Sequence, residues 1–159
     1  MQILTISDSH GKVNSIRLLL QRYCSQVQTV IHLGDNANDI LQFQHEYPAL
    51  NMVAVAGNSD FCTSVPKELI LTLDTRRVLL MHGHSHNVKM SYDRLIYYAQ
   101  EKGVDACLFG HSHIPAMFSH GSVFFMNPGS VSEPRGLSKA GYGIITISDG
   151  NITGKVYEL

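Results

Sequence analysis

The stretch LFGHSHIP (residues 108–115) ends an apolar run in clustered histidines, and LMHGHSHN (residues 80–87) has the same form. A folded core has little use for histidines, so their place directly after apolar runs indicates a shared site. Both stretches belong to a set of five short, β-rich apolar runs, at residues 3–7, 29–33, 52–56, 78–82 and 106–110. Because these runs are nearly continuous rather than alternating, they are typical of strands covered on both faces.

Helical patterns separate some of these runs, and the alternation predicts an α/β fold. The helical patterns cover residues 13–24, 38–47 and 91–103. After residue 115 the pattern changes to paired extended runs, and the Asp149-Gly150 pair is a strong signal for a hairpin turn. We therefore expect the last third of the chain to form antiparallel strands.

Composition excludes several classes of protein. The 159 residues, 44% of them hydrophobic, are expected to form a single domain over residues 1–159. A net charge of -1 provides no general attraction to nucleic acid or to anionic membranes. The N-terminus lacks a secretory pattern, and no apolar run is long enough to span a bilayer. Together with three scattered cysteines, Cys24, Cys62 and Cys107, these features predict a cytoplasmic protein that does not bind membranes.

A polar cluster directly follows each of the five apolar runs. The clusters are DSHG (8–11), GDNAND (34–39), GNSD (57–60), HGHSH (82–86) and GHSH (110–113). Ligands of α/β sheets bind outside the carboxyl ends of the strands, so the five clusters can converge on one crevice. Each cluster alone could be a turn, a helix start or a buried histidine. Together they would place seven metal-type ligands at strand ends by accident, which favours one common site.

Seven side chains in these clusters form a mixed oxygen and nitrogen ligand set: Asp8, His10, Asp35, Asn58, His82, His111 and His113. Asp8 and His10 are two residues apart in a stretch expected to be extended, which points both side chains the same way. His111 and His113 form a second such pair. A bridging Asp35 carboxylate would allow about four protein ligands for each of two cations. Imidazole with carboxylate suits Mn, Fe, Ni or Zn better than Ca, and the absence of Cys argues against a structural zinc site.

The order of the motifs DSH, GDN, GNSD, HGH and GHSH resembles the calcineurin-like metallophosphoesterase superfamily. The chain is most similar to its small, single-domain bacterial and archaeal phosphodiesterases, and NPGSVSEPR (127–135) also resembles that branch. The resemblance covers nearly the whole chain and implies a four-layer α-β-β-α sandwich of two mixed β-sheets flanked by helices. It also implies one metal at Asp8, His10, Asp35 and His113, and a second at Asp35, Asn58, His82 and His111.

One position departs from the superfamily pattern. Many members have a histidine after the Asn of the GN motif, thought to protonate the leaving group, whereas this chain has Ser59. A serine hydroxyl is a poor proton donor at neutral pH. His84 and His86 are the nearest replacements in the sequence, with an ordinary solvated loop as the equal alternative. Asp60 is expected to order the loop rather than to bind metal.

These features predict a dinuclear metal-dependent phosphoesterase, a phosphodiesterase rather than a phosphomonoesterase. It would use two divalent ions, manganese first and Fe, Ni or Zn as alternatives, to activate water for attack on a small phosphate ester. Asp35, Asn58 and His84 are the expected catalytic residues. Two alternatives remain open: a weakly catalytic protein-interaction scaffold that retains a metal site, and a metal-binding or metal-sensing module without chemistry.

The sequence does not identify the substrate or the oligomeric state. There is no strong signal for nucleic-acid binding, although Lys89, Arg94 or Arg135 could contact a phosphate. The apolar stretch MFSHGSVFFM (117–126) could contribute to a homo-oligomer interface, but the core of a sheet is its expected use.

Overall fold

The computed structural model describes residues 1–61 and 63–159, so Cys62 lies outside the described residues. The strands are β1 (Gln2–Ile6), β2 (Thr29–His32), β3 (Asn51–Ala54), β4 (Glu68–Leu73), β5 (Arg76–Met81), β6 (Ala106–Leu108), β7 (Ala116–His120), β8 (Val123–Asn127), β9 (Gly141–Ser148) and β10 (Asn151–Glu158). The helices are α1 (Val13–Tyr23), α2 (Asn38–Leu41), the 3₁₀ turn η1 (His84–His86) and α3 (Asp93–Lys102). No helix in the described part of the chain is long and apolar enough to cross a bilayer.

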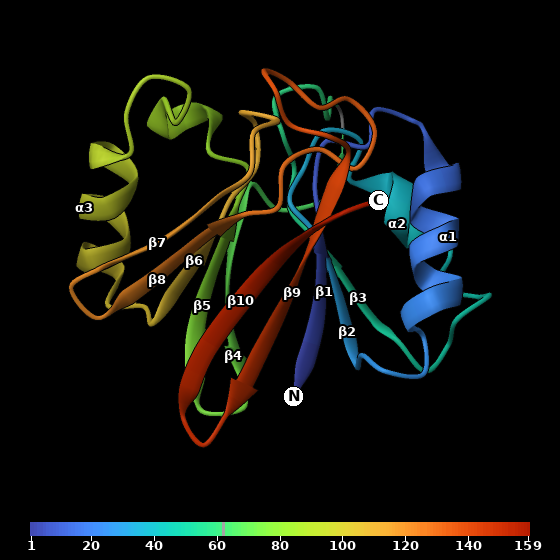
Figure 1. The fold of residues 1–159 in the computed structure, drawn as a ribbon, viewed down its shortest axis with the longest axis horizontal. Helices are drawn as coiled ribbons and strands as arrows, with labels where there is room; N and C mark the ends of the chain where they lie inside the picture. Colours follow the sequence, from blue (N-terminus) through green and yellow to red (C-terminus); the bar gives the residue numbers. More distant parts are fainter. Residues whose placement is uncertain (62) are drawn as a thin grey trace.

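The strands form two mixed sheets of five strands each (Figure 1). The first sheet has the order β10-β9-β1-β2-β3, with β1, β2 and β3 parallel. The second has the order β4-β5-β6-β8-β7, with β5, β6 and β8 parallel. Helices α1 and α2 cover the outer face of the first sheet, and α3 covers that of the second (Figure 1). The layers therefore run helix, sheet, sheet, helix, which confirms the expected four-layer α/β sandwich.

Three apolar cores separate the four layers, and neighbouring residues of the central strands belong to different cores. In β5, Leu79 packs toward α3 while Leu80 packs between the two sheets. In β1, Ile3 faces the space between the sheets while Leu4 faces α1. All four side chains are fully buried. Successive residues of a strand point to opposite faces. A strand with two buried faces therefore needs apolar residues at every position, which explains the continuous apolar runs.

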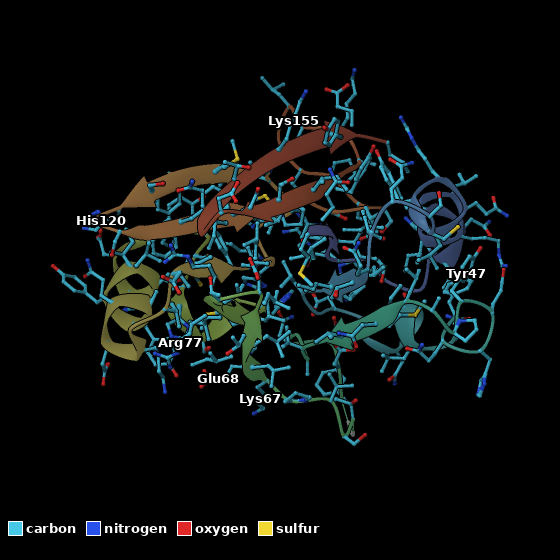
Figure 2. The ribbon with its side chains drawn as sticks, turned by 90° about the horizontal axis from the view of Figure 1, so that it is seen from below. Tyr47, Lys67, Glu68, Arg77, His120 and Lys155 are labelled. Atoms are coloured by element: carbon cyan, nitrogen blue, oxygen red, sulfur yellow. The ribbon has the colours of Figure 1, made fainter. Side chains whose placement is uncertain are left out.

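Strand β4 was not predicted from the sequence. This strand pairs antiparallel with β5 at the edge of the second sheet, and Glu68 lies opposite Met81. Most of its residues are only half-buried or exposed, so it lacks the continuous apolar character of the central strands. Lys67 and Glu68, where β4 begins, lie on the opposite side of the molecule from Lys155 of β10 (Figure 2).

The helix expected over residues 38–47 is much shorter than predicted. Helix α2 ends at Leu41, and the chain continues in tight turns. The backbone N–H groups of Phe43 and Gln44 donate to carbonyls three residues earlier rather than four. Pro48 also disfavours helical backbone in the residue before it. Phe43 nevertheless packs in the core, so the apolar residues keep a helix-like spacing although the backbone is not helical. This spacing suggested a longer helix.

Two predictions for the last third of the chain are confirmed. Asp149 and Gly150 connect β9 to β10 with φ values of 52° and 74°, the left-handed pair that a tight hairpin turn requires. The stretch 117–126 forms most of the β7–β8 hairpin, and its Phe125 and Met126 are fully buried in two of the cores. The sheet core is therefore the observed use of Phe125 and Met126, whereas Met117 of β7 is 50% exposed and a homo-oligomer interface stays a prediction.

Replacing Leu80 with Ala should lower the free energy of unfolding by about 2–5 kcal/mol, because the inter-sheet core cannot collapse around the cavity. Urea denaturation would measure this change. Leu18→Ala is the matched control: its side chain on α1 is 60% exposed, and the expected change is about 0.5 kcal/mol or less. Equal effects of the two substitutions would contradict the assigned core.

Candidate metal centre

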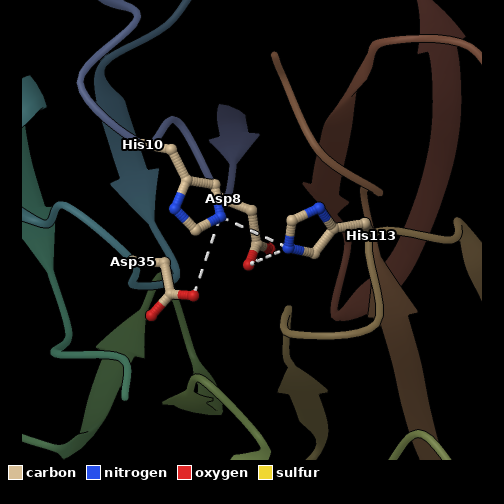
Figure 3. A group of neighbouring side chains, drawn as sticks. All are labelled: Asp8, His10, Asp35 and His113. Atoms are coloured by element: carbon tan, nitrogen blue, oxygen red, sulfur yellow. Dashed lines mark hydrogen bonds and ion pairs between the residues drawn. The ribbon is translucent and has the colours of Figure 1, made fainter. Parts of the chain in front are cut away.

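Six of the seven predicted ligand residues meet where the strand ends of the two sheets face each other. They form two groups, Asp8 with His10, Asp35 and His113, and Asp35 with His82 and His111. Within each group the candidate ligand atoms lie within 4.8 Å of one another. Figure 3 shows the first group, with the two imidazole rings turned toward the carboxylates. Asp35 belongs to both groups, which fits a carboxylate shared between two cations.

Asn58 is the seventh predicted ligand, and it is exposed on the turn after β3. The next residue, Ser59, connects this turn to the centre, because its backbone N–H donates to Asp35 Oδ1 at 2.9 Å. Asp60 orders this turn, as expected, by accepting backbone hydrogen bonds from Gly57 (2.7 Å) and Ala37 (2.8 Å). A ligand role for Asn58 stays a prediction.

The backbone at the centre is unusual, because five of the six residues have left-handed φ values. These are 55° for Asp8, 48° for His10, 58° for Asp35, 68° for His111 and 60° for His113. The expectation that the two pairs lie in extended backbone was therefore wrong. Tight turns, not strand geometry, point these side chains at one another. A non-glycine residue in this region stores strain, which folded proteins tolerate mainly at functional sites.

The donor set fits a bound cation. The Nδ1–H of His82 donates to the Leu33 carbonyl at 2.7 Å, so in the neutral ring Nε2 carries the lone pair, 3.4 Å from Asp35 Oδ1. The Nδ1–H of His113 donates to the Glu133 carbonyl in the same way, and its Nε2 lies 3.2 Å from Asp8 Oδ1.

Asp8 Oδ1 is buried and accepts no hydrogen bond from the described residues. Converging lone pairs around an unsatisfied buried oxygen are what a divalent metal would stabilise.

Residues 1–150 match the calcineurin-like phosphoesterase superfamily domain. The chain belongs to this superfamily. It is 35% identical over 159 residues to the probable metallophosphoesterase YsnB of Bacillus subtilis (strain 168), which covers 99% of this chain and 91% of that protein. It is 28% identical over 169 residues to the phosphodiesterase YfcE of Escherichia coli (strain K12), with 91% and 87% covered.

A solved structure agrees with this assignment. The crystal structure of a predicted phosphoesterase from Streptococcus pneumoniae TIGR4 superposes with a TM-score of 0.85 at 31% identity, covering 99% of this chain and 88% of that one. The chain is thus a member of a hydrolase family, and the two groups of side chains form its candidate metal centre.

The charges of this metallophosphoesterase centre depend on one another. Burial raises the pKa of Asp8 and Asp35, but the neighbouring His113 and His82 outweigh this effect and hold both pKa values below the usual range. Burial lowers the pKa of His82, yet Asp35 and Asp8 raise it overall. Contact with Asp8 raises the pKa of His113. Burial and the nearby His82 lower the pKa of His111 to about 4, so its imidazole is neutral at neutral pH.

A buried hydrogen-bonded network of His32, Ser9 and Asp39, not predicted from the sequence, lies beside the centre. The Gly34 N–H donates to His32 Nδ1 at 3.2 Å, so His32 Nε2 carries the proton and donates to Ser9 Oγ at 2.8 Å. The Ser9 hydroxyl in turn donates to Asp39 Oδ2 at 2.7 Å. Asp39 also accepts the backbone N–H of Gly11 at 2.8 Å.

The hydrogen bonds among His32, Ser9 and Asp39 tie the loop that carries Asp8 and His10 to the loop that carries Asp35. Burial lowers the pKa of His32 to about 4, which keeps the ring neutral, and its hydrogen bonds with Gly34 and Ser9 fix the tautomer. The available sequence signal was a histidine inside the apolar run 29–33. Its partners could not be identified there, because they lie in other loops.

The segment NPGSVSEPR (127–135) supports the centre from the other side. The amide of Asn127 donates to the Gly110 carbonyl at 2.8 Å and so holds the start of the GHSH loop. The hydroxyl of Ser130 donates to the backbone carbonyl of Asp8 at 2.7 Å. The segment therefore connects the first and last loops of the candidate metal centre.

The structure separates the two histidines considered as replacements for the missing proton donor. The ring of His84 lies 5.5 Å from that of His82 and 6.1 Å from that of His111, measured between centroids. The ring of His86 packs against Tyr98 of α3, with a centroid distance of 4.6 Å. His84 is therefore the one of the two that borders the centre.

Replacing Ser9 with Ala should destabilise the protein by about 1–3 kcal/mol, because the buried groups of His32 and Asp39 lose their shared partner. We also expect weaker Mn²⁺ binding, since the loops that carry the ligands would no longer be tied together. Urea denaturation and calorimetry measure the two effects. Ser148→Ala removes only an exposed hydroxyl and should change stability by about 0.5 kcal/mol or less. Unchanged metal affinity in the Ser9 variant would refute the positioning role.

The affinity for divalent metal should fall on acidification. Because the pKa values of His82 and His113 are raised above 6.5, protons begin to compete with the cation above that pH. Asp8 and Asp35 stay ionised over this range, since their pKa values are lowered. Calorimetric titration with Mn²⁺ should show affinity falling about ten-fold or more between about pH 8 and about pH 6. Constant affinity over this range would rule out the proton competition.

Proposed function

We propose that this chain is a dinuclear metal-dependent phosphodiesterase that acts on small phosphate esters. The observation that carries the proposal is the position of Asp35, which lies in both groups of candidate ligands. Similarity to the phosphodiesterase YfcE supports the choice of diesters. Two divalent cations would supply Lewis acidity and activate water for attack on phosphorus. The oxygen and nitrogen donors favour Mn, with Fe, Ni or Zn as alternatives.

In this proposal one cation would be held by Asp8, His10, Asp35 and His113, and the other by Asp35, Asn58, His82 and His111. The carbonyls of Leu33 and Glu133 keep the Nε2 atoms of His82 and His113 directed inward, so these ligands need no rearrangement on binding. The Ser59 backbone N–H fixes one oxygen of Asp35 and directs the other toward His10 Nε2, 3.7 Å away. The protein thus prepares the centre before substrate arrives.

The leaving group receives little help from a proton donor. Burial and the neighbouring His82 lower the pKa of His84, so its ring is neutral at neutral pH. Ser59 is equally unsuited to protonate an alkoxide. We therefore propose that the preferred esters have leaving groups that depart without protonation, and that His84 contacts substrate.

A scaffold or metal-sensing role is less well supported, because the candidate ligands of both groups are present and closely placed. Either alternative would bind metal without turnover. A cytoplasmic location is also part of the proposal: Cys24 and Cys107 are free thiols, as is usual in a reducing compartment.

Chelator-treated protein should release p-nitrophenolate from bis-p-nitrophenyl phosphate only after Mn²⁺ is added, and faster than from p-nitrophenyl phosphate. Asp35→Asn should lower this activity by about 100-fold or more, because the charge shared by both cations is lost. Asp149→Asn, the same change at the distant β9–β10 turn, is the control and should leave the rate unchanged. Tight metal binding without turnover would exclude the enzyme and favour the scaffold or sensing roles.

A further inference from the structure

A cleft of about 310 Å³ adjoins the candidate metal centre. His82 and His84 line it on the side of the centre, and the start of β4 forms the opposite wall. Met81 and Gly83 line it between these walls, so much of its surface is apolar. A volume near 300 Å³ is at the lower end of the range for small-molecule sites. The cleft can therefore hold a ring-sized group beside the metal centre.

The wall formed by β4 is held rigidly. Glu68 pairs with Met81 across the β4–β5 ladder, and its carboxylate accepts the Tyr98 hydroxyl at 2.9 and 2.8 Å. Lys102 of α3 lies 3.8 Å from the same carboxylate. The negative charge of Glu68 is therefore already compensated from the side of α3.

Lys67 is different, because no carboxylate of the described residues lies within ion-pair distance of its ammonium group. It is exposed and lines the cleft. His84 Nδ1 is buried and has no hydrogen-bond partner among the described residues. The cleft thus combines an apolar floor with an uncompensated positive charge and a free imidazole nitrogen.

We propose that this cleft binds the retained substituent of the phosphodiester and selects a ring-sized group that carries its own negative charge, contacted by Lys67. The inference rests on the proposed function. The retained substituent needs no proton when the other ester bond breaks, so the cleft that holds it needs no acid. The attacked phosphate would lie at the metal centre, with the retained group extending past His82 into the cleft.

Three substrates with one leaving group test this selection, since each releases p-nitrophenolate. They are methyl, phenyl and 4-carboxyphenyl p-nitrophenyl phosphate. For the wild-type protein with Mn²⁺, KM should fall in that order. The carboxylate should lower KM about two- to five-fold relative to phenyl, the size expected for an exposed ion pair.

Each side of the cleft is tested by one variant and a matched control: Lys67→Met at the start of β4, and Ser85→Trp on η1. Lys67→Met should remove the preference for carboxyphenyl over phenyl, whereas Lys155→Met, on the opposite side of the molecule (Figure 2), should not. Ser85→Trp, on η1, should fill the cleft with its side chain. Because the phenyl group then no longer fits, the ratio of KM for phenyl p-nitrophenyl phosphate to KM for methyl p-nitrophenyl phosphate should rise about five-fold or more. Ser119→Trp on the exposed edge strand β7 is its control.

Binding of phosphonates separates the cleft from catalysis, because their P–C bond is not hydrolysed. Calorimetry on the Mn²⁺-loaded protein should show 4-carboxyphenylphosphonate binding more tightly than phenylphosphonate, with the difference lost in Lys67→Met. If no ester is hydrolysed but this preference is observed, the proposed catalysis fails and the cleft assignment stands. Equal binding of the two phosphonates, or ratios unchanged by Lys67→Met and Ser85→Trp, would overturn the cleft assignment even in an active enzyme.

Discussion

Two ionised carboxylates, Asp8 and Asp35, lie in the interior of the protein, and the surrounding loops compensate their charge. Removing such a charge from water costs several kcal/mol unless donors or cations replace the lost hydration. Asp8 receives the Ser7 hydroxyl at 2.6 Å and the His111 backbone N–H at 3.1 Å. Asp35 receives the backbone N–H of Ser59. The loops after four different strands therefore have to meet at this point. The groups that compensate the charges of the two carboxylates leave room there for bound cations.

Close approach of these loops requires residues without side chains. A Cβ atom at Gly57 would overlap the carboxylate of Asp35, and one at Gly110 would overlap the Ser7 hydroxyl and come within 2.9 Å of Asp8 Oδ2. The glycines of the GN and GHSH motifs thus serve packing rather than chemistry. The left-handed backbone of the candidate ligand residues is strained and must be held in place, so the centre depends on the rigidity of both sheets beneath it.

How well the fold could be predicted depended on how deeply each element is buried. The five central runs were recognisable because both faces of their strands contact apolar layers. Strand β4 was missed because it lies at a sheet edge with half-buried side chains, although it forms one wall of the cleft. Residues 43–47 were predicted as helix because Phe43 and Tyr47 lie at helical spacing in the sequence. Both side chains do contact the core, but the backbone around them forms turns.

The sequence by itself determined the type of site: which residues can bind metal, and that each follows a buried strand. These properties are local, since they depend on side-chain chemistry and on the apolar run just before it. Only the tertiary structure decided that carbonyls of Leu33 and Glu133 orient two imidazoles, and that the cleft opens beside them. These properties depend on distances between groups far apart in the chain, such as the 3.3 Å between the Nε2 atoms of His10 and His113. Packing of the two sheets sets such distances, and no local pattern encodes them.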